Sequence, residues 1–336
     1  MPKNYFRKQE LIKVILISLL SLFSACSNQS ITAKKLAVDS KLAQDTAAGK
    51  KAEGGFSFKD VTLEQPDEQG RPLWKVKAKE AVYSNNNKIA KVQNPFGDLF
   101  QDGKIVYQIS ALAGEIQQDG KRIFLKGQIV ATDTQNGVVL RGNELEWLPE
   151  EDKLIVRNQL TGSHKEVEAS AREALAFSRS KRIELIGQVI ANTKEPPLQL
   201  KTEHLIWQVD DKKMISDRQI QIDRFVAGKI TDRAFGNQSE VDLKTKIATL
   251  KQNALVIAAD PPLDIASNLI VWNYNAKTVS SDVPVRLLHR TEQINLNSDK
   301  GQVDLQAKIA HLTGKVNGSG QKPPSQMRAA EMTWYL

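Results

Sequence analysis

The sequence is poor in the residues from which many active sites are built. Its single cysteine, Cys26, cannot form a disulfide within the chain, so packing and backbone pairing must stabilise the fold. Histidine is scarce, and its four copies show no zinc-site spacing: His164, His204, His289 and His311. No phosphate-binding glycine loop and no nucleophile elbow occurs. The sequence therefore predicts no catalytic residue, no metal and no cofactor.

Charge of one sign is also sparse. The formal net charge is +8, and no block of like charge stands out along the chain. Nucleic-acid binding has little support from such a pattern, whereas a mildly basic surface suits an anionic lipid headgroup. Carboxylates at strand spacing are usually solvated, although Glu144 and Glu146 share one face and could form a glycosidase pair.

Long apolar runs are missing except near the N-terminus. The run from Val14 to Ala25 is shorter than the roughly 20 residues of a membrane-spanning helix. It follows a basic segment and ends directly before Cys26, which is typical of a bacterial lipoprotein signal. We therefore expect a signal peptide over 1–25, an acylated Cys26, and a lipidated N-terminus and flexible tether over 26–55. The alternative is a free cysteine beside an ordinary secretory cleavage site.

From Phe56 onward, apolar and polar residues alternate. RIFLKGQIVA (122–131) places Ile123 and Leu125 on one face, and turn signals such as QDG (101–103) recur at short intervals. Short strands with frequent turns and no long helical pattern predict an all-β sandwich, jelly roll or barrel. The segment 164–181 has helix-like composition, but its alternation of Val167 with polar residues predicts a strand.

A repeat of 60 to 65 residues runs through this region. VLRGNELEWLPEEDKLIVR (139–157) matches LQLKTEHLIWQVDDKKMIS (198–216) and LDIASNLIVWNYNAKTVSS (263–281), each with Leu or Ile two before Trp. Units of this kind must stack to bury their inward faces. We interpret the Gly-Gln steps at 127–128 and 187–188 as turns between consecutive strands.

Seven large side chains are predicted to face the interior of this stack: Leu125, Leu145, Trp147, Leu185, Leu205, Trp207 and Ile270. The tryptophans are either core aromatics between sheets or the border of an apolar channel for acyl chains. Small inward residues leave the same choice open, since they indicate either an unfilled groove or tight packing: Ala111, Ala113, Ala169 and Ala171.

The chain resembles the LptC family, the membrane-anchored periplasmic components of lipopolysaccharide export, which is related to the LptA/OstA-like β proteins. Three stretches carry the resemblance: GRPLWKVKAKEAVY (70–83), RIFLKGQIVA (122–131) and NELEW (143–147). The resemblance covers 56–225 and continues over 226–336 only as further repeats of the same stack. This chain departs from the family in its greater length and in its anchor, which has the pattern of an acylated cysteine.

The resemblance implies an elongated open β-jellyroll, built of stacked antiparallel β-hairpin repeats, that carries lipid acyl chains inside. The implied partners are lipopolysaccharide or a related glycolipid, inner-membrane ABC transporter subunits, and another periplasmic β-jellyroll bound by edge-strand pairing. The expected location is the periplasm, anchored to the inner membrane through the N-terminus. Two alternatives stay open: an adaptor lipoprotein with a solid β core, and an envelope protein that binds or processes polysaccharide.

Overall fold

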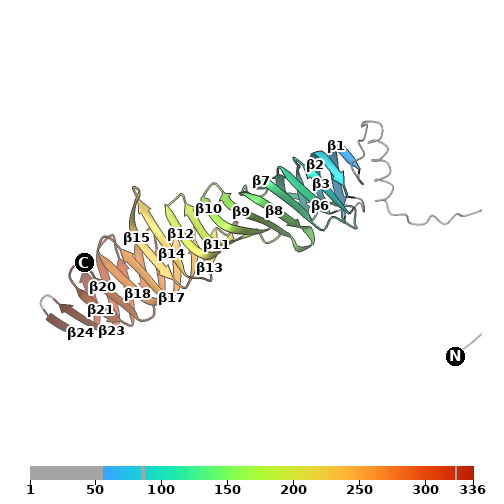
Figure 1. The fold of residues 1–336 in the computed structure, drawn as a ribbon. Coiled ribbons are helices and arrows are strands. Elements are labelled where there is room, and N and C mark those ends of the chain that lie inside the picture. The colour runs from blue at the N-terminus through green and yellow to red at the C-terminus, as the bar shows by residue number, and fades with distance from the viewer. Residues whose placement is uncertain (1–55, 85–87, 118, 322–323) are drawn as a thin grey trace, which may run out of the picture. The chain divides into compact units, whose positions relative to one another are not determined.

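A computed structural model describes residues 56–84, 88–117, 119–321 and 324–336, which all belong to one compact unit of the chain. Nearly all of these residues lie in antiparallel strands, with a single short 3-10 turn at Pro149–Glu151 within the described part (Figure 1). The all-β prediction is confirmed. Cys26, the signal peptide and the tether lie outside the described residues.

The strands are of two kinds. Twelve of them, in the described part, have 10 to 13 residues: β1 (Ser57–Pro66), β2 (Pro72–Tyr83), β7 (Ile123–Asp133), β8 (Val139–Leu148), β9 (Lys153–Ser163), β10 (Val167–Phe177), β11 (Arg182–Thr193), β12 (Leu198–Gln208), β17 (Ile247–Ala258), β18 (Leu263–Asn273), β23 (Ile309–Gln321) and β24 (Pro324–Tyr335). The others are shorter: β3 (Ile89–Gln93), β4 (Phe96–Gln101), β5 (Lys104–Ser110), β6 (Ala113–Gln117), β13 (Lys213–Ser216), β14 (Ile220–Val226), β15 (Lys229–Gly236), β16 (Gln238–Asp242), β19 (Thr278–Ser281), β20 (Val285–His289), β21 (Ile294–Ser298) and β22 (Lys300–Asp304).

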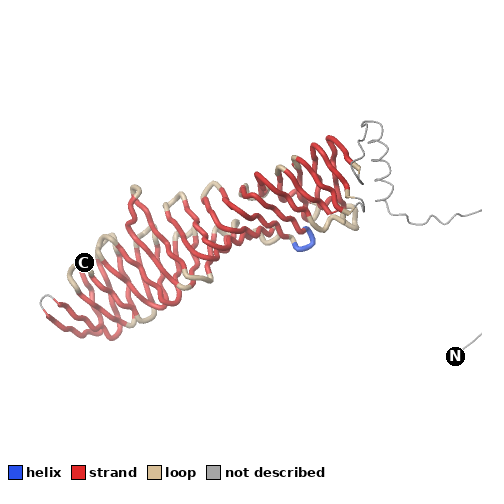
Figure 2. The backbone as a smooth tube through the Cα atoms, in the orientation of Figure 1, coloured by secondary structure: helices blue, strands red, loops and turns tan. Residues whose placement is uncertain are grey.

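Successive levels of the chain lie side by side. Each long strand pairs antiparallel with the next, and some levels replace one long strand by two short ones. Thus β12 pairs with β13 along one half and with β14 along the other, and β18 does the same with β19 and β20. The result is a continuous stack of antiparallel strands in chain order (Figures 1 and 2).

A bend divides the long strands into two halves. The pairing register shifts inside β7, β11, β17 and β23, always near the middle of the strand. At each shift two successive residues have positive φ, for example Gly127 and Gln128 at 75° and 49°. We call this line of bends the corner, because the one continuous sheet folds there into two halves, which we call the two sheets.

The interpretation of the Gly-Gln steps as turns between strands is wrong. Gly127 and Gln128 lie inside β7, and Gly187 and Gln188 lie inside β11. Their positive φ values produce a bulge instead of a reversal, because pairing with the neighbouring strand resumes directly after them.

Reversals occur in two rows of turns at the far ends of the two halves. From β7 onward, the row-one turns are 149–152, 178–181, 209–212, 243–246, 274–277 and 305–308, and the row-two turns are 134–138, 164–166, 194–197, 227–228, 259–262 and 290–293. Backbone hydrogen bonds connect successive turns of one row. In row one, the N–H of Leu243 donates to the carbonyl of Lys212 at 2.9 Å, and the N–H of Tyr274 donates to Lys246 at 3.1 Å.

The predicted repeat appears directly in the strand register. Leu125 pairs with Leu145 and Ile123 with Trp147, at the start of the first repeat. In the next repeat Leu185 pairs with Leu205, and in the third Leu250 pairs with Ile270. The same inward contacts therefore recur at successive levels. The segment with helix-like composition forms strand β10, as its alternation predicts.

Candidate lipid-binding interior

The space between the two sheets is lined by apolar side chains. All seven residues predicted to face inward are buried there, with exposed fractions from 0% at Leu125, Leu145, Trp147, Leu205 and Ile270 to 3% at Leu185 and 6% at Trp207. Their inward orientation follows from the alternation of the strands, which turns every second side chain to the same face. Of the small residues predicted inward, Ala111 is buried and Ala113 is exposed.

Ala113 faces outward because the in-and-out alternation of side chains is interrupted between Ala111 and Ala113. Leu112 lies between strands β5 and β6, and it contributes backbone hydrogen bonds to Asn94 and Gly127. Strand β6 starts afresh at Ala113 and turns Gly114 and Ile116 inward. Sequence alternation cannot reveal such a break, since Leu112 and both of its neighbours, Ala111 and Ala113, are apolar.

The two rows of turns face each other across the side of the interior opposite the corner, which we call the mouth. Aromatic pairs cross it between the two sheets. Tyr107 meets Trp147 at 5.9 Å between ring centroids, and His164 meets Trp207 at 5.2 Å, both edge to face. These pairs place the repeated tryptophans at the rim of the interior, where sequence reasoning had not distinguished rim from core.

A third aromatic pair continues the series near the C-terminal end of the stack. His289 and Trp334 have ring centroids 5.7 Å apart. Such pairs stabilise by about 0.5–1.5 kcal/mol beyond the burial of their area. Burial in this rim lowers the pKa of His164, because the charged imidazolium loses contact with water there.

Charged side chains also span the mouth. Lys212 of row one reaches Glu166 of row two at 2.6 Å, and Lys308 reaches Asp260 at 2.7 Å. The pKa of Glu166 is lowered, mainly by its hydrogen bond from Lys212. These residues are partly exposed, so each ion pair contributes at most about 1 kcal/mol. Together with the aromatic pairs, they hold the mouth closed in this structure.

The interior is filled by its own side chains at the level of Leu185 and Trp207. A space of only about 10 Å³ remains there, lined also by Val138, Leu140, Gly162, Val167, Ala169 and Ile183. That is about the room of one water molecule and far too little for an alkyl chain. An acyl chain can therefore enter at this level only if the two sheets move apart.

The rim also holds buried polar groups. The indole N–H groups of Trp147 and Trp207 are buried and have no hydrogen-bond partner. At the row-two end of the stack, the β14–β15 hairpin holds a buried ion pair between Arg224 and Asp232 at 3.0 Å. Sequence reasoning missed this pair, although alternation places Arg224 on the same face as Ile220 and Ile222, because a charged side chain is rarely buried.

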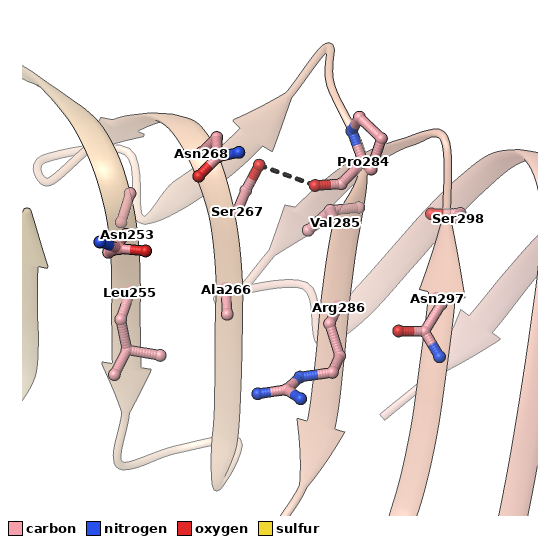
Figure 3. A pocket seen from close by; sticks show the side chains of 11 residues that line it. Asn253, Leu255, Ala266, Ser267, Asn268, Pro284, Val285, Arg286, Asn297 and Ser298 are labelled. Carbon is pink, nitrogen blue, oxygen red and sulfur yellow. Dashed lines mark hydrogen bonds between the residues drawn. The ribbon is translucent and has the colours of Figure 1, made fainter.

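A second hollow lies on the outer surface beside the corner. It has a volume of about 520 Å³ and is lined by residues of β17, β18, β20 and β21 and the adjoining bends, among them Asn253, Asn268, Arg286 and Asn297 (Figure 3). Its floor is Ala266, and register places Lys201 at the corresponding position one repeat earlier. The small side chain therefore accounts for the hollow.

The terminal strands leave one edge each without a partner strand in the described residues. Strand β1 pairs with β2 alone, and β24 pairs with β23 alone. Large apolar side chains are exposed at these two ends, with 65% exposure at Phe56 and 76% at Tyr335. Unpaired edges of this kind can add a strand from another protein.

Two kinds of feature are absent from the part of the chain that the structure describes. No group of three or more His, Cys, Asp or Glu side chains there could hold a metal ion. No helix among these residues has the length and apolarity needed to cross a membrane.

Comparison with known families agrees with this architecture. The sequence model of one family, described as "Lipopolysaccharide-assembly, LptC-related", matches residues 14–155 and again residues 140–257. The chain belongs to the LptC-related family. Membership assigns the chain to lipopolysaccharide transport in the cell envelope. Two overlapping matches agree with the repeat in the strand register, and the later strands continue the same pairing beyond residue 257. No curated protein matches the chain.

Proposed function

We propose that the chain is a periplasmic lipid-transfer scaffold without catalytic residues. It accepts lipopolysaccharide from an inner-membrane ABC transporter and passes it through the space between its sheets toward the outer membrane. The main support is the repeated inward contact seen in the pairs Leu125–Leu145, Leu185–Leu205 and Leu250–Ile270. A lining that is alike at every level gives acyl chains sites of similar affinity, so lipid is not trapped at one of them.

The energetics favour such a sheltered route. Each CH₂ moved from water into an apolar site contributes about 0.8 kcal/mol, so a lipid with several acyl chains cannot cross water unaided. The buried residues Trp147, Trp207 and Ile270 would contact these chains once the mouth opens. The headgroup, which is polar and large, would remain outside between the two rows of turns.

The anchor and the partners belong to the same proposal. An acylated Cys26 with a tether over 26–55 would hold the stack close to the inner membrane, which agrees with the signal-like segment before it. The exposed edge of β1 would pair with the transporter side, and that of β24 with the next β-jellyroll. The division into 56–225 and 226–336 remains a prediction as well.

The proposal can be tested with photoreactive side chains. A photoreactive amino acid at Trp147 or Trp207 should form crosslinks to lipopolysaccharide in living cells. Phe124 serves as the matched control, because it lies next to Leu125 but on the outer face of β7. Crosslinks from Phe124 alone would contradict transport through the interior.

A second candidate function is an adaptor lipoprotein that binds other envelope proteins around a solid core. The filled interior beside Leu185 and Trp207 favours it. Depletion of the protein separates the two functions. Accumulation of lipopolysaccharide at the inner membrane supports transport, whereas unchanged lipopolysaccharide with loss of an envelope complex supports the adaptor.

A further inference from the structure

A line of lysines runs along one side of the mouth. The last residue of five row-one turns is a lysine with φ between 49° and 64°, and its carbonyl accepts a hydrogen bond from the residue one turn further on: Lys181, Lys212, Lys246, Lys277 and Lys308. Successive lysines are separated by two strand spacings, which is about 10 Å. The fold thus repeats a positive charge at regular intervals beside the interior.

The side chains of these lysines differ in what they contact. Lys212 and Lys308 are neutralised by carboxylates across the mouth, at Glu166 and Asp260. Lys181 contacts Asp210 of the next turn in its own row at 2.5 Å. These three positions therefore carry little free charge.

The two turns between them are different. Lys246 also reaches across the mouth, but it donates to the backbone carbonyl of Glu195 at 2.8 Å, which is a neutral acceptor. Within the described residues the side chain of Lys277 has no hydrogen-bond or ion-pair partner, and neither has that of Lys244. Three ammonium groups thus lie on two adjacent turns without a carboxylate to pair with.

These two turns contain no acidic residue that would neutralise their lysines. Turns 243–246 and 274–277 contain no Asp or Glu, whereas turns 149–152 and 209–212 contain several. Asp242 directly precedes the first of the basic turns. One oxygen of its carboxylate accepts two backbone N–H groups of that turn, each at 2.8 Å. These hydrogen bonds stabilise the charged carboxylate of Asp242, but its single negative charge is outnumbered by Lys244, Lys246 and Lys277, so the two turns are basic.

The interior beneath the basic turns is mainly apolar, with the buried hydroxyl of Ser239 beside Leu250. Ala248, Leu250, Ile270 and Trp272 all have 0% exposure there. An amphiphile whose acyl chains occupied this space would hold its headgroup against the lysines, and ammonium groups bind phosphate strongly. We propose that Lys244, Lys246 and Lys277 form a binding site for phosphate groups on the headgroup of the transported glycolipid. This inference rests on the proposed transport function.

The test compares two triple variants of the full-length chain. In one, Lys244, Lys246 and Lys277 are replaced by Gln. The control replaces three exposed lysines that face outward from β2, β3 and β17 and form no ion pair, and so changes the net charge equally: Lys79, Lys91 and Lys251. The probes are purified lipopolysaccharide, the same lipopolysaccharide after enzymatic removal of its phosphates, and phosphatidylglycerol vesicles.

The mouth variant should bind phosphorylated lipopolysaccharide about tenfold more weakly than the parent chain, as expected for the loss of three charge contacts at the surface. Its affinity for the dephosphorylated form should equal that of the parent, and the control should bind both forms normally. Equal losses in both variants, or equal loss with both forms of the lipid, would overturn the site. So would a loss seen with the vesicles alone, which would mean that the lysines face a membrane. If the mouth variant binds phosphorylated lipopolysaccharide like the parent chain, while a photoreactive group at Trp147 still crosslinks to lipid, the transport function is supported and the phosphate site is excluded.

Discussion

At the scale of single residues, the corner imposes the strictest demand on the sequence. Two successive residues must adopt positive φ, which side chains other than glycine tolerate at a cost of about 1–2 kcal/mol. Gly187 meets this demand in β11 with φ 78°, while Gln252 and Asn253 meet it in β17 with 59° and 54°. Position 187 is also crowded, since a Cβ there would lie 2.3 Å from Nε of Arg172.

We expect Gly187→Val to lower the free energy of unfolding by about 2 kcal/mol, because a β-branched side chain resists positive φ. Gly187→Asn should cost less than half as much, since Asn adopts positive φ more readily than Val and the corresponding position of β17 holds a non-glycine residue, Gln252, at φ 59°. Urea denaturation of both variants measures the difference. Equal losses would show that crowding by Arg172 is decisive and that backbone conformation is not.

The sequence predicts inward faces well and bends poorly. Ile123 and Leu125 are inward as alternation requires, because the period of a strand fixes side-chain direction. The Gly-Gln step in the same strand is compatible with either a turn or a bulge, since both structures need positive φ at the glycine. Only the resumed pairing of Ile129 with Gly142 distinguishes the two, and that contact is not local in sequence.

At the scale of elements, the last strand combines a free edge with a half-covered inner face. Met332 and Trp334 turn toward the core and are only partly buried, because no further level covers them. Thr333 lies between them and points outward. An added strand from a neighbouring β-jellyroll would cover the inner face of β24 and satisfy its free backbone groups.

Met332→Lys should therefore weaken binding of a partner β-jellyroll at least tenfold, since the charge would be buried in the new contact. Its effect on the stability of the chain itself should be below about 1 kcal/mol, because position 332 is still partly exposed. Thr333→Lys is the matched control with the same added charge on the outer side, and it should bind normally. Co-purification of the envelope partner measures both, and equal binding by the two variants would exclude β24 as the docking edge.

Contacts across the mouth show where prediction from sequence ends. The repeated Trp147 and Trp207 could be identified as a pattern, but their partners Tyr107 and His164 lie about 40 residues away and share no motif. Such pairs arise because two sheets fold back on each other at the corner. The sequence indicates which strands pair. Strand pairing alone does not determine how the two sheets close on each other.

At the scale of the whole described stack, transport and stability make opposite demands on the mouth. The links Lys212–Glu166 and His164–Trp207 hold the sheets together, and the space left beside Trp207 is about 10 Å³. Lipid passage requires that these links break and re-form at each level in turn. Exposed ion pairs and single aromatic contacts suit this role, since each contributes only about 1 kcal/mol.

A chemical staple across the mouth tests this directly. Cysteines replacing Glu166 and Lys212 can be joined by a bifunctional maleimide, and Cys26 is the only native cysteine that could interfere. The staple should abolish lipid crosslinking to a photoreactive group at Trp207, because the sheets can no longer separate there. In the control, cysteines replace Glu168 and Lys194, whose side chains form an ion pair of 3.4 Å on the row-two side. A staple between these two positions does not cross the mouth and leaves it free to open. Full crosslinking in the stapled mouth variant would mean that lipid enters the interior from an end of the stack, past β1 or β24, and not through the mouth.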